Sequence, residues 1–187
     1  MKNIAVFGAG GFGREVKTII DDINKEKKEY NFVGFFDDGF QKGEIINGFP
    51  ILGGVADINK IEEEFSLVIA IGDPKTKLKI REKISNDFIV YPNIIHPKAI
   101  VSGDYVEIGI GNIITAGCII TCNIKIENFV ILNLMCTVGH DTTIKSYASF
   151  MPSVNISGEV IIHEKVYVGT GAKIINLLEI GENTIVG

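Results

Sequence analysis

The chain has 187 residues, of which 46% are hydrophobic and 22% charged, and its formal net charge is −5. This composition fits one large or two small folded domains and excludes a disordered chain; no apolar run reaches the ~20 residues of a membrane-spanning helix. The acidic balance argues against a nucleic-acid partner, and three cysteines without zinc-ligand spacing favour a reducing, cytoplasmic location over a disulfide framework.

The first half of the chain, residues 1–92, alternates short apolar runs with amphipathic segments. The expected strands are residues 2–7, 32–36 and 67–71, and the expected helices are residues 14–28 and 74–85. Strands that alternate with helices indicate a small parallel sheet, here an α/β Rossmann-like half domain. Prolines 92 and 97 mark the linker that follows.

A glycine-rich turn joins the first strand to the first helix. Its segment 8–13 fits G-x-G-x-x-G, which lets a backbone approach a ligand and directs a helix N-terminus at phosphate. Asp37 lies 24 residues after Gly13, where it could accept hydrogen bonds from ribose hydroxyls. An NAD-dependent oxidoreductase would share these features, but a dinucleotide fold needs two such halves. A nucleotide-linked substrate therefore fits better than NAD, and a tight turn without a ligand stays the alternative.

From Ile108 onward the sequence follows a period of six. Every sixth residue is large and apolar: Ile108, Ile114, Ile120, Ile126, Leu132, Val138, Ile144, Phe150, Ile156, Ile162, Val168, Ile174, Ile180 and Val186. This period indicates hexapeptide repeats, three of which close one triangular coil of a parallel β-helix, so that residues eighteen apart stack. The large aliphatic residues should fill the interior, and glycines that follow them, such as Gly109 and Gly139, should form the corners. Cys118 and Cys136, eighteen apart, should be stacked core thiols.

The repeat resembles the hexapeptide acyltransferases, and the two halves together resemble the PglD/NeuD-like family of sugar O- and N-acyltransferases. The resemblance implies a nucleotide-sugar-binding domain at residues 1–92 and a left-handed β-helix acyltransferase domain at residues 93–187. It also implies a homotrimer with acetyl-CoA between neighbouring subunits. The expected reaction moves an acetyl group from acetyl-CoA to an amine or hydroxyl of a sugar, preferably UDP-linked, in surface-glycan biosynthesis. Relatives usually continue with another coil and a tail, so this chain is expected to lack its last coil.

His140 is the candidate general base. It lies two positions past the interior residue Val138, so its side chain should point outward from a corner. Acyl transfer needs a base whose pKa is near neutrality, and Asp141 could orient the imidazole. The family motif places a catalytic histidine and a carboxylate here, with an asparagine seven residues earlier, which is Asn133. A corner histidine without a role is the alternative.

The resemblance further implies two sets of binding residues. The sugar nucleotide would contact Gly10, Gly11, Phe12, Asp37, Asp38 and Gly72, and acetyl-CoA would contact Ser149, Gly158 and Thr170. Two positions depart from the family pattern. Phe12 and Ser149 stand where the bacillosamine-type turn and many relatives, respectively, have histidine. The acceptor sugar, and the choice between N- and O-transfer, therefore stay open.

Two other functions use the same architecture. A zinc enzyme of the γ-carbonic-anhydrase type needs three histidine ligands, two of them close in sequence. The three histidines, His96, His140 and His163, are 44 and 23 residues apart, so no metal site is predicted. A trimeric structural protein, or one that binds a nucleotide sugar with little catalysis, stays an alternative because a fold does not fix its function.

Overall fold

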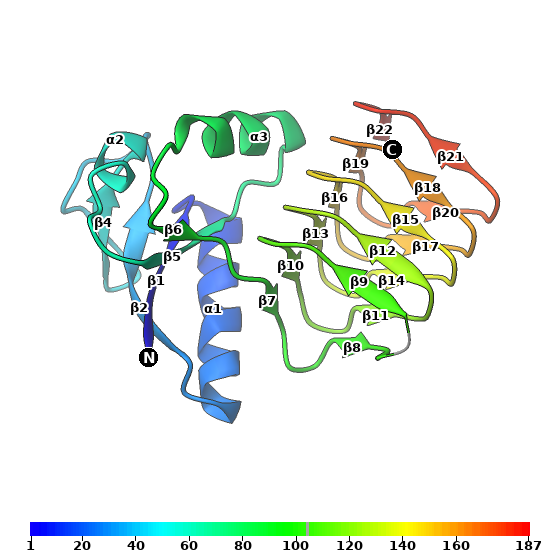
Figure 1. Ribbon diagram of the computed structural model, residues 1–187, viewed down its shortest axis with the longest axis horizontal. Helices are drawn as coiled ribbons and strands as arrows, with labels where there is room; N and C mark the ends of the chain where they lie inside the picture. The colour runs from blue at the N-terminus through cyan, green and yellow to red at the C-terminus, as the bar shows by residue number, and fades with distance from the viewer. Residues whose placement is uncertain (104) are drawn as a thin grey trace. The chain divides into compact units, whose positions relative to one another are not determined.

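The computed structural model describes residues 1–103 and 105–187 (Figure 1). They divide into two compact units. The N-terminal unit comprises residues 1–72 and 76–92, and the C-terminal unit comprises residues 73–75 and 93–187. Among the described helices, none is both long and apolar enough to cross a membrane. The functions that the sequence assigns to the two parts of the chain stay predictions at this point.

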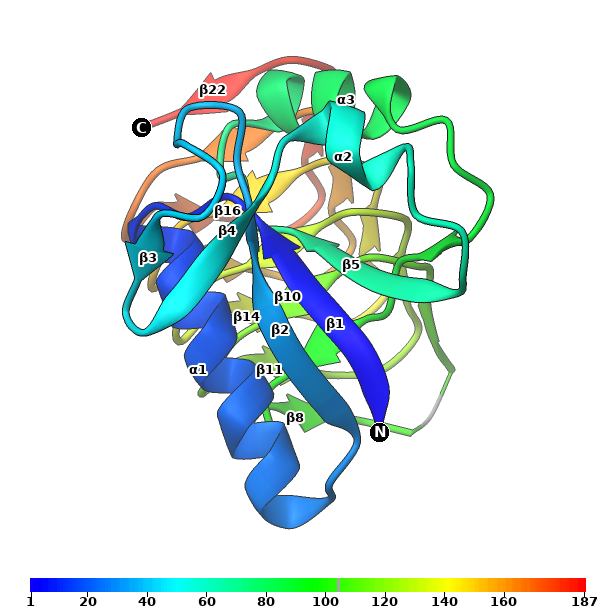
Figure 2. The same cartoon turned by 90° about the vertical axis from the view of Figure 1, so that its left-hand side faces the viewer.

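The N-terminal unit contains a six-stranded sheet with the strand order β3-β4-β2-β1-β5-β6. Its elements are β1 (Lys2–Phe7), α1 (Gly11–Glu26), β2 (Tyr30–Phe36), β3 (Ile45–Ile46), β4 (Phe49–Gly53), α2 (Val55–Ile58), β5 (Phe65–Ile69), α3 (Pro74–Lys83) and β6 (Ile89–Val90). Neighbouring strands are parallel except in the β3–β4 hairpin. Figure 2 shows β1 between β2 and β5. The predicted α/β half domain is confirmed.

Several predicted bounds and elements of this unit were wrong. Strand β2 begins at Tyr30 and not at residue 32, and β4, β6 and the short helix α2 were not predicted. Strand β5 begins two residues earlier than expected because Phe65 and Ser66 pair with β6. Helix α1 begins at Gly11, because the glycine-rich turn reverses the chain within three residues and the Arg14 N–H donates to the Gly10 carbonyl at 3.1 Å. The β3–β4 hairpin was missed, although its Asn47-Gly48 turn has the positive φ values (48° and 84°) that this dipeptide favours in hairpins.

The C-terminal unit winds short parallel strands into three flat faces (Figure 1). The first face contains β7 (Ile94–Ile95), β10 (Ile113–Ile114), β13 (Ile131–Leu132), β16 (Ser149–Phe150), β19 (Tyr167–Val168) and β22 (Ile185–Val186). The second contains β8 (Ile100–Val101), β11 (Ile119–Ile120), β14 (Thr137–Val138), β17 (Asn155–Ile156) and β20 (Lys173–Ile174). The third contains β9 (Val106–Ile108), β12 (Ile124–Ile126), β15 (Thr143–Ile144), β18 (Ile161–Ile162) and β21 (Glu179–Ile180). Partners such as Thr137 and Asn155 are eighteen residues apart, which confirms the predicted triangular coil.

The interior of this β-helix is filled by the residues that the period of six picks out. From Ile114 to Ile174 each of them is at most 4% exposed, and Ile108, Ile180 and Val186 pack against the ends of the same core. The Cys118 and Cys136 thiols are free, buried and stacked, and they donate to the carbonyls of Asn133 and Met151 at 3.2 and 3.3 Å. The predicted core and its thiols are therefore confirmed.

The corners differ from the prediction. They are formed by left-handed residues with φ between 55° and 76°, which from Gly111 onward lie three positions after an interior residue: Tyr105, Gly111, Gly117, Asn123, Phe129, Met135, Asp141, Tyr147, Ser153, Glu159, Lys165, Gly171, Leu177 and Asn183. Three of these fourteen are glycine, and each of the others accepts a conformation that disfavours a Cβ by roughly 1 kcal/mol. Gly139, which follows the interior residue Val138, serves close approach instead, because a Cβ on it would lie 2.6 Å from the Gly158 nitrogen.

The β-helix begins at β7, two strands before the first residue of the count, Ile108, and within the predicted domain of residues 93–187. Ile95 pairs with Ile114, and Val101 pairs with Ile120, so these partners are nineteen residues apart. Ile108 pairs with Ile126, eighteen residues further on. One additional residue between Val101 and Ile108 shifts the register, so counting back by six from Ile108 does not reach the interior residues Val101 and Ile95.

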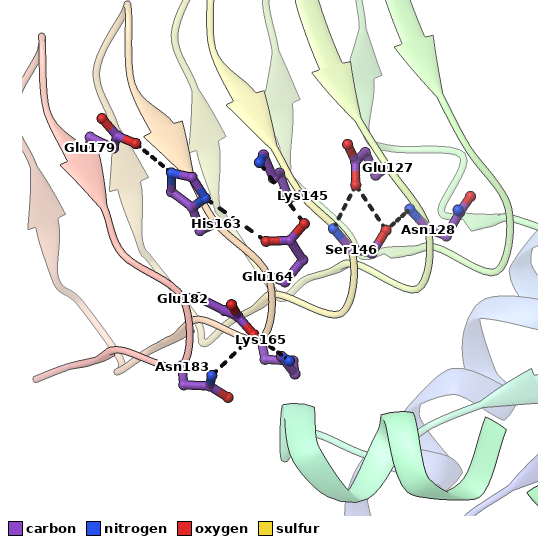
Figure 3. A network of polar contacts seen from close by, with 10 residues as sticks. All are labelled: Glu127, Asn128, Lys145, Ser146, His163, Glu164, Lys165, Glu179, Glu182 and Asn183. Atoms are coloured by element: carbon purple, nitrogen blue, oxygen red, sulfur yellow. Dashed lines mark hydrogen bonds and ion pairs between the residues drawn. The ribbon is translucent and has the colours of Figure 1, made fainter. Parts of the chain in front are cut away.

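Charged side chains connect successive coils on the outside of the third face. His163 Nε2 lies 2.5 Å from Glu179 Oε1, and Lys165 Nζ lies 2.5 Å from Glu182 Oε1 (Figure 3). Each pair joins one coil to the next. Because the two carboxylates are solvent-exposed, water and salt screen these pairs, and each contributes little to the free energy of unfolding.

We expect the interior residue Phe150 to be among the most sensitive positions of the β-helix. Its ring is completely buried, so Phe150→Ala should lower the free energy of unfolding by about 3–5 kcal/mol through lost burial and a residual cavity. Urea unfolding followed by circular dichroism measures this change. Ile161→Ala is the control, because Ile161 lies outside the core and is 41% exposed; an equal loss in both variants would contradict the interior role of Phe150.

Candidate active site

His140 lies at the corner that joins β14 to β15, and its side chain is 58% exposed, as predicted for an outward-pointing residue. Its Nδ1 atom lies 2.7 Å from Asp141 Oδ2. An ionised carboxylate only accepts hydrogen bonds, so Nδ1 carries the proton and Nε2 keeps its lone pair. This is the tautomer that a general base requires.

Gly158, one coil after His140, lies against the imidazole ring. A Cβ built on Gly158 would come within 2.6 Å of both Cε1 and Nε2 of His140 and within 3.0 Å of Cδ2. Real Cβ atoms do not approach other heavy atoms this closely, so any side chain at position 158 would displace the ring. The absence of a Cβ at this position therefore helps to set where Nε2 lies.

Asp141 is held by the coil that precedes it. Asn123 Nδ2 donates to Asp141 Oδ1 at 3.1 Å, and the Asp141 N–H donates to the Cys122 carbonyl at 3.2 Å. The hydrogen bonds from His140 and then from Asn123 hold the pKa of the Asp141 carboxyl below its usual range. Because this pKa is lowered in the folded protein, the Asp141 carboxyl stays ionised as pH falls and is protonated only when pH passes below the lowered value.

The predicted third catalytic residue, Asn133, lies at a different corner. It follows β13, whereas His140 follows β14, so the width of the second face separates them within one chain. Asn133 is 7% exposed, and its Oδ1 accepts a hydrogen bond from the Leu134 N–H at 2.7 Å. One chain therefore does not bring Asn133 and His140 together.

The predicted acetyl-CoA residues are similarly distributed. Gly158 lies at the corner of His140, and the exposed Thr170 follows β19 at the corner of Asn133. Ser149 lies on β16 and is completely buried. The roles of these residues toward acetyl-CoA stay predictions.

The other two histidines have different surroundings. His96 is buried, and its Nδ1 accepts a hydrogen bond from the Lys98 N–H at 2.9 Å. His163 points toward Glu179 and Glu164 on the third face (Figure 3). Within residues 1–103 and 105–187 no group of three or more His, Cys, Asp or Glu side chains is arranged to hold a metal ion.

The predicted nucleotide site lies where parallel strands of the N-terminal unit end. The glycine-rich turn follows β1, Asp37 follows β2, and Gly72 follows the end of β5. Because β1 lies between β2 and β5 in parallel register, their carboxyl ends meet at one edge of the sheet. The order of the strands reverses there, which is the usual place for a ligand in such sheets.

The glycines of this turn have separate tasks. A Cβ on Gly13 would lie 1.7 Å from the Gly8 carbonyl oxygen, so Gly13 allows α1 to pack closely on the turn. No atom lies within 4 Å of a Cβ built on Gly10 or Gly11, which leaves space beside the N-terminus of α1. Phe12, in the first turn of α1, is partly exposed. The first N–H groups of a helix have no partner within it and can donate to phosphate.

The two aspartates support the backbone around this turn. Asp37 Oδ2 accepts from the Ala9 N–H at 2.9 Å and Asp37 Oδ1 from the Gly39 N–H at 2.8 Å. Asp38 Oδ1 accepts from the Val55 N–H at the start of α2, also at 2.9 Å. Both carboxylates thus already bind backbone groups, and contacts to a substrate stay predictions for them and for Gly72. A separate groove on this unit is lined by apolar residues such as Val33 and Phe36 and by charged residues such as Lys60 and Glu63, and none of the predicted substrate residues lines it.

Comparison with known proteins identifies the family. Residues 3–84 match the model of the PglD N-terminal domain. The chain is 30% identical to GDP-perosamine N-acetyltransferase from Escherichia coli O157:H7 over 174 residues, which cover 93% of this chain and 78% of that protein. The chain belongs to the PglD/NeuD-like family of sugar acyltransferases. Membership assigns the left-handed winding to the β-helix.

Two further PglD/NeuD-like proteins are informative. UDP-N-acetylbacillosamine N-acetyltransferase from Bacillus subtilis (strain 168) is 32% identical over 123 residues, which cover 62% of this chain and 52% of that protein. The acetyltransferase domain of PglB from Neisseria gonorrhoeae FA1090, solved in complex with acetyl coenzyme A, superposes with a TM-score of 0.88 at 28% identity. That match covers 98% of this chain and 87% of the PglB chain.

Asn123 is a site residue that the sequence prediction missed. It lies eighteen residues before Asp141, which is one coil of the β-helix. Residues eighteen apart stack, as Cys118 and Cys136 do. The same spacing places Asn123 and Glu159 on either side of Asp141, and Gly158 beside His140.

We expect Gly158→Ala to leave the PglD/NeuD-like fold intact and to impair catalysis. The new Cβ must push the His140 ring aside, and a displacement of about 1 Å can lower kcat by about 10²-fold. Thiol release from acetyl-CoA measures kcat. Gly181→Ala is the matched control, because its Cβ would meet its nearest neighbour, Thr184 Oγ1, at 3.8 Å; a similar kcat for both variants would show that Gly158 does not set the ring position.

Proposed function

We propose that this chain is an N-acetyltransferase that moves the acetyl group of acetyl-CoA to the amino group of a nucleotide-linked amino sugar. The observation that carries this proposal is the exposed His140–Asp141 pair, whose 2.7 Å contact leaves Nε2 of His140 as the base. Its relatives in Escherichia coli and Bacillus subtilis are both named as N-acetyltransferases of nucleotide sugars, which favours N- over O-transfer. The PglB relative binds acetyl coenzyme A, in agreement with acetyl-CoA as the co-substrate.

The reaction needs one proton to leave the attacking amine and one to reach the sulfur. The sugar nitrogen attacks the thioester carbonyl carbon while Nε2 of His140 takes the nitrogen-bound proton. The negative charge of Asp141 stabilises the imidazolium that forms. The tetrahedral intermediate then breaks its C–S bond, and the imidazolium returns the proton to the departing thiolate. The products are the N-acetylated sugar and free CoA.

The nucleotide is the second part of the substrate. We place it at the glycine-rich turn, with phosphates at the N-terminus of α1 beside Gly10, Gly11 and Phe12, and the nucleoside near Asp37 and Asp38. The sequence favoured UDP, whereas the relative in Escherichia coli is named for a GDP-linked sugar and the relative in Bacillus subtilis for a UDP-linked one. The proposal is therefore a nucleoside-diphosphate amino sugar, used in surface-glycan biosynthesis.

We further propose that the complete active site forms between copies of the chain, as in the predicted homotrimer. His140 and Gly158 lie at one corner of the second face, and Asn133 and Thr170 lie at the other. Two copies that meet along their corners would bring the corner of one chain to the opposite corner of the next, with acetyl-CoA between them. Ser149 on the first face is completely buried, so it would contact acetyl-CoA only if the residues around it moved.

We expect His140→Gln to lower kcat by about 10²–10⁴-fold, because glutamine cannot accept the proton of the amine. Thiol release from acetyl-CoA in the presence of the amino sugar is the measurement. His163→Gln is the matched control, since His163 binds Glu179 on the third face and should affect kcat little. Full turnover by His140→Gln would refute the assignment of His140 as the base.

We expect Gly10→Val to raise the KM for the nucleotide sugar about tenfold, because the side chain would occupy the space beside the phosphate-binding turn. The KM for acetyl-CoA should stay the same. Steady-state kinetics with GDP- and UDP-linked 4-amino sugars, and with the corresponding 4-hydroxy sugars, also identify the nucleotide and the acceptor group. Turnover of the hydroxy sugars alone would contradict N-transfer, and an unchanged KM would move the nucleotide site away from Gly10.

A further inference from the structure

Two neighbouring coils hold the catalytic pair from opposite sides. On the following side, the Glu159 N–H donates to the His140 carbonyl at 2.8 Å, and Gly158 limits where the imidazole can lie. On the preceding side, the backbone of Asp141 is bound to Cys122. Asn123 adds a side-chain contact from the preceding coil, at 3.1 Å from Asp141 Oδ1.

The Asn123 contact orients the Asp141 carboxylate so that its second oxygen faces the histidine. The carboxylate is 50% exposed, so its torsion is not fixed by packing. With Oδ1 held by Asn123, Oδ2 is directed at His140 Nδ1, 2.7 Å away. An ionised carboxylate offers no donor, so the Asn123 group that faces it must be the amide NH₂.

We propose that Asn123 is a positioning residue for the acetyl-transfer reaction, which acts through Asp141 to hold His140 in the tautomer with Nε2 unprotonated. The proposal rests on His140 being the base. Asn123, Asp141 and His140 then form a chain of two hydrogen bonds that spans two coils. A carboxylate that is free to turn would satisfy Nδ1 part of the time and would also allow the tautomer with the proton on Nε2, which cannot accept a proton from the amine.

The backbone at Asn123 permits a clean substitution. Its φ is 55°, a conformation that glycine adopts without strain, so Asn123→Gly removes the amide and keeps the corner. Asn123→Asp keeps the shape but replaces the donor with a second carboxylate facing Asp141. Asn183→Gly is the matched control, because Asn183 is a left-handed corner residue with φ of 61° whose amide binds the exposed Glu182.

Three measurements test the role of Asn123. We expect Asn123→Gly to lower kcat about tenfold with KM for acetyl-CoA unchanged, Asn123→Asp to lower it further, and Asn183→Gly to behave as the unsubstituted protein. In an Asp141→Asn background, Asn123→Gly should cause no additional loss, because its effect passes through Asp141. ¹⁵N NMR of the histidine side chains, with His140 assigned from His140→Gln, should show Nδ1 protonated in the unsubstituted protein and a mixture of tautomers in Asn123→Gly.

The pKa of Asp141 provides an independent readout. Because Asn123 is one of the two donors that lower it, Asn123→Gly should raise this pKa toward the ordinary value of about 3.9, as measured by ¹³C NMR of the carboxyl. An unchanged kcat, an unchanged His140 tautomer or losses that multiply in the Asp141→Asn background would each overturn the role of Asn123. The NMR measurements need no substrate, so they judge Asn123 even if His140→Gln retains activity and the assignment of the base fails.

Discussion

The stacking of one coil on the next at the strand spacing of a β-sheet is the constraint on which the C-terminal unit depends. Each strand from β12 to β19 pairs with the strand eighteen residues before it and the strand eighteen residues after it, so the corner residues of these coils have a fixed neighbour on both sides. The candidate active site uses this arrangement. Asn123, the His140–Asp141 pair and Gly158 come from three consecutive coils, and each restricts the next through contact across one strand spacing.

The left-handed corners are the other consequence of this geometry. From Tyr105 onward each turn places one residue at positive φ, whether or not that residue is glycine. Burial of the aliphatic interior compensates for this unfavourable backbone conformation, since a fully buried Ile or Leu side chain contributes about 1.5–3 kcal/mol. Asp141 has this strained conformation, with φ of 57°, and its carboxylate lies 2.7 Å from Nδ1 of the preceding His140.

The sequence predicted the architecture well because the period of six shows directly which side chains are buried in the β-helix and which are exposed. It predicted the interior of every coil from Ile108 onward, the stacked thiols and the outward direction of His140. It did not predict the corners, because φ is set by the closure of the coil and non-glycine residues occupy most of these positions. The count of six started at Ile108 and did not extend to β7 and β8, because one additional residue before Ile108 shifts the register. The contact of Asp37 with Ala9 needed three-dimensional information, since the two residues are 28 positions apart on different strand ends.

Among the candidate site residues, some contacts follow from the sequence and others need the structure. His140 and Asp141 are adjacent in sequence, so their partnership could be predicted without a structure. Gly158 was assigned to acetyl-CoA, and its contact with the imidazole became visible only from the space a Cβ would occupy. Asn133 shows the opposite case, because seven residues along one coil place it at the far corner of the same face as His140.

The additional residue between Val101 and Ile108 has a consequence for how the length of this chain can vary. An insertion there leaves all later coils in register, because it precedes the first of the three coils that form the site. Between Asn123 and Gly158 the same insertion would move one partner off its corner and separate the amide, the carboxylate and the ring. The spacing of the β-helix therefore fixes the number of residues between Asn123 and Gly158. Whole coils of eighteen residues could be added outside this stretch without disturbing the candidate site.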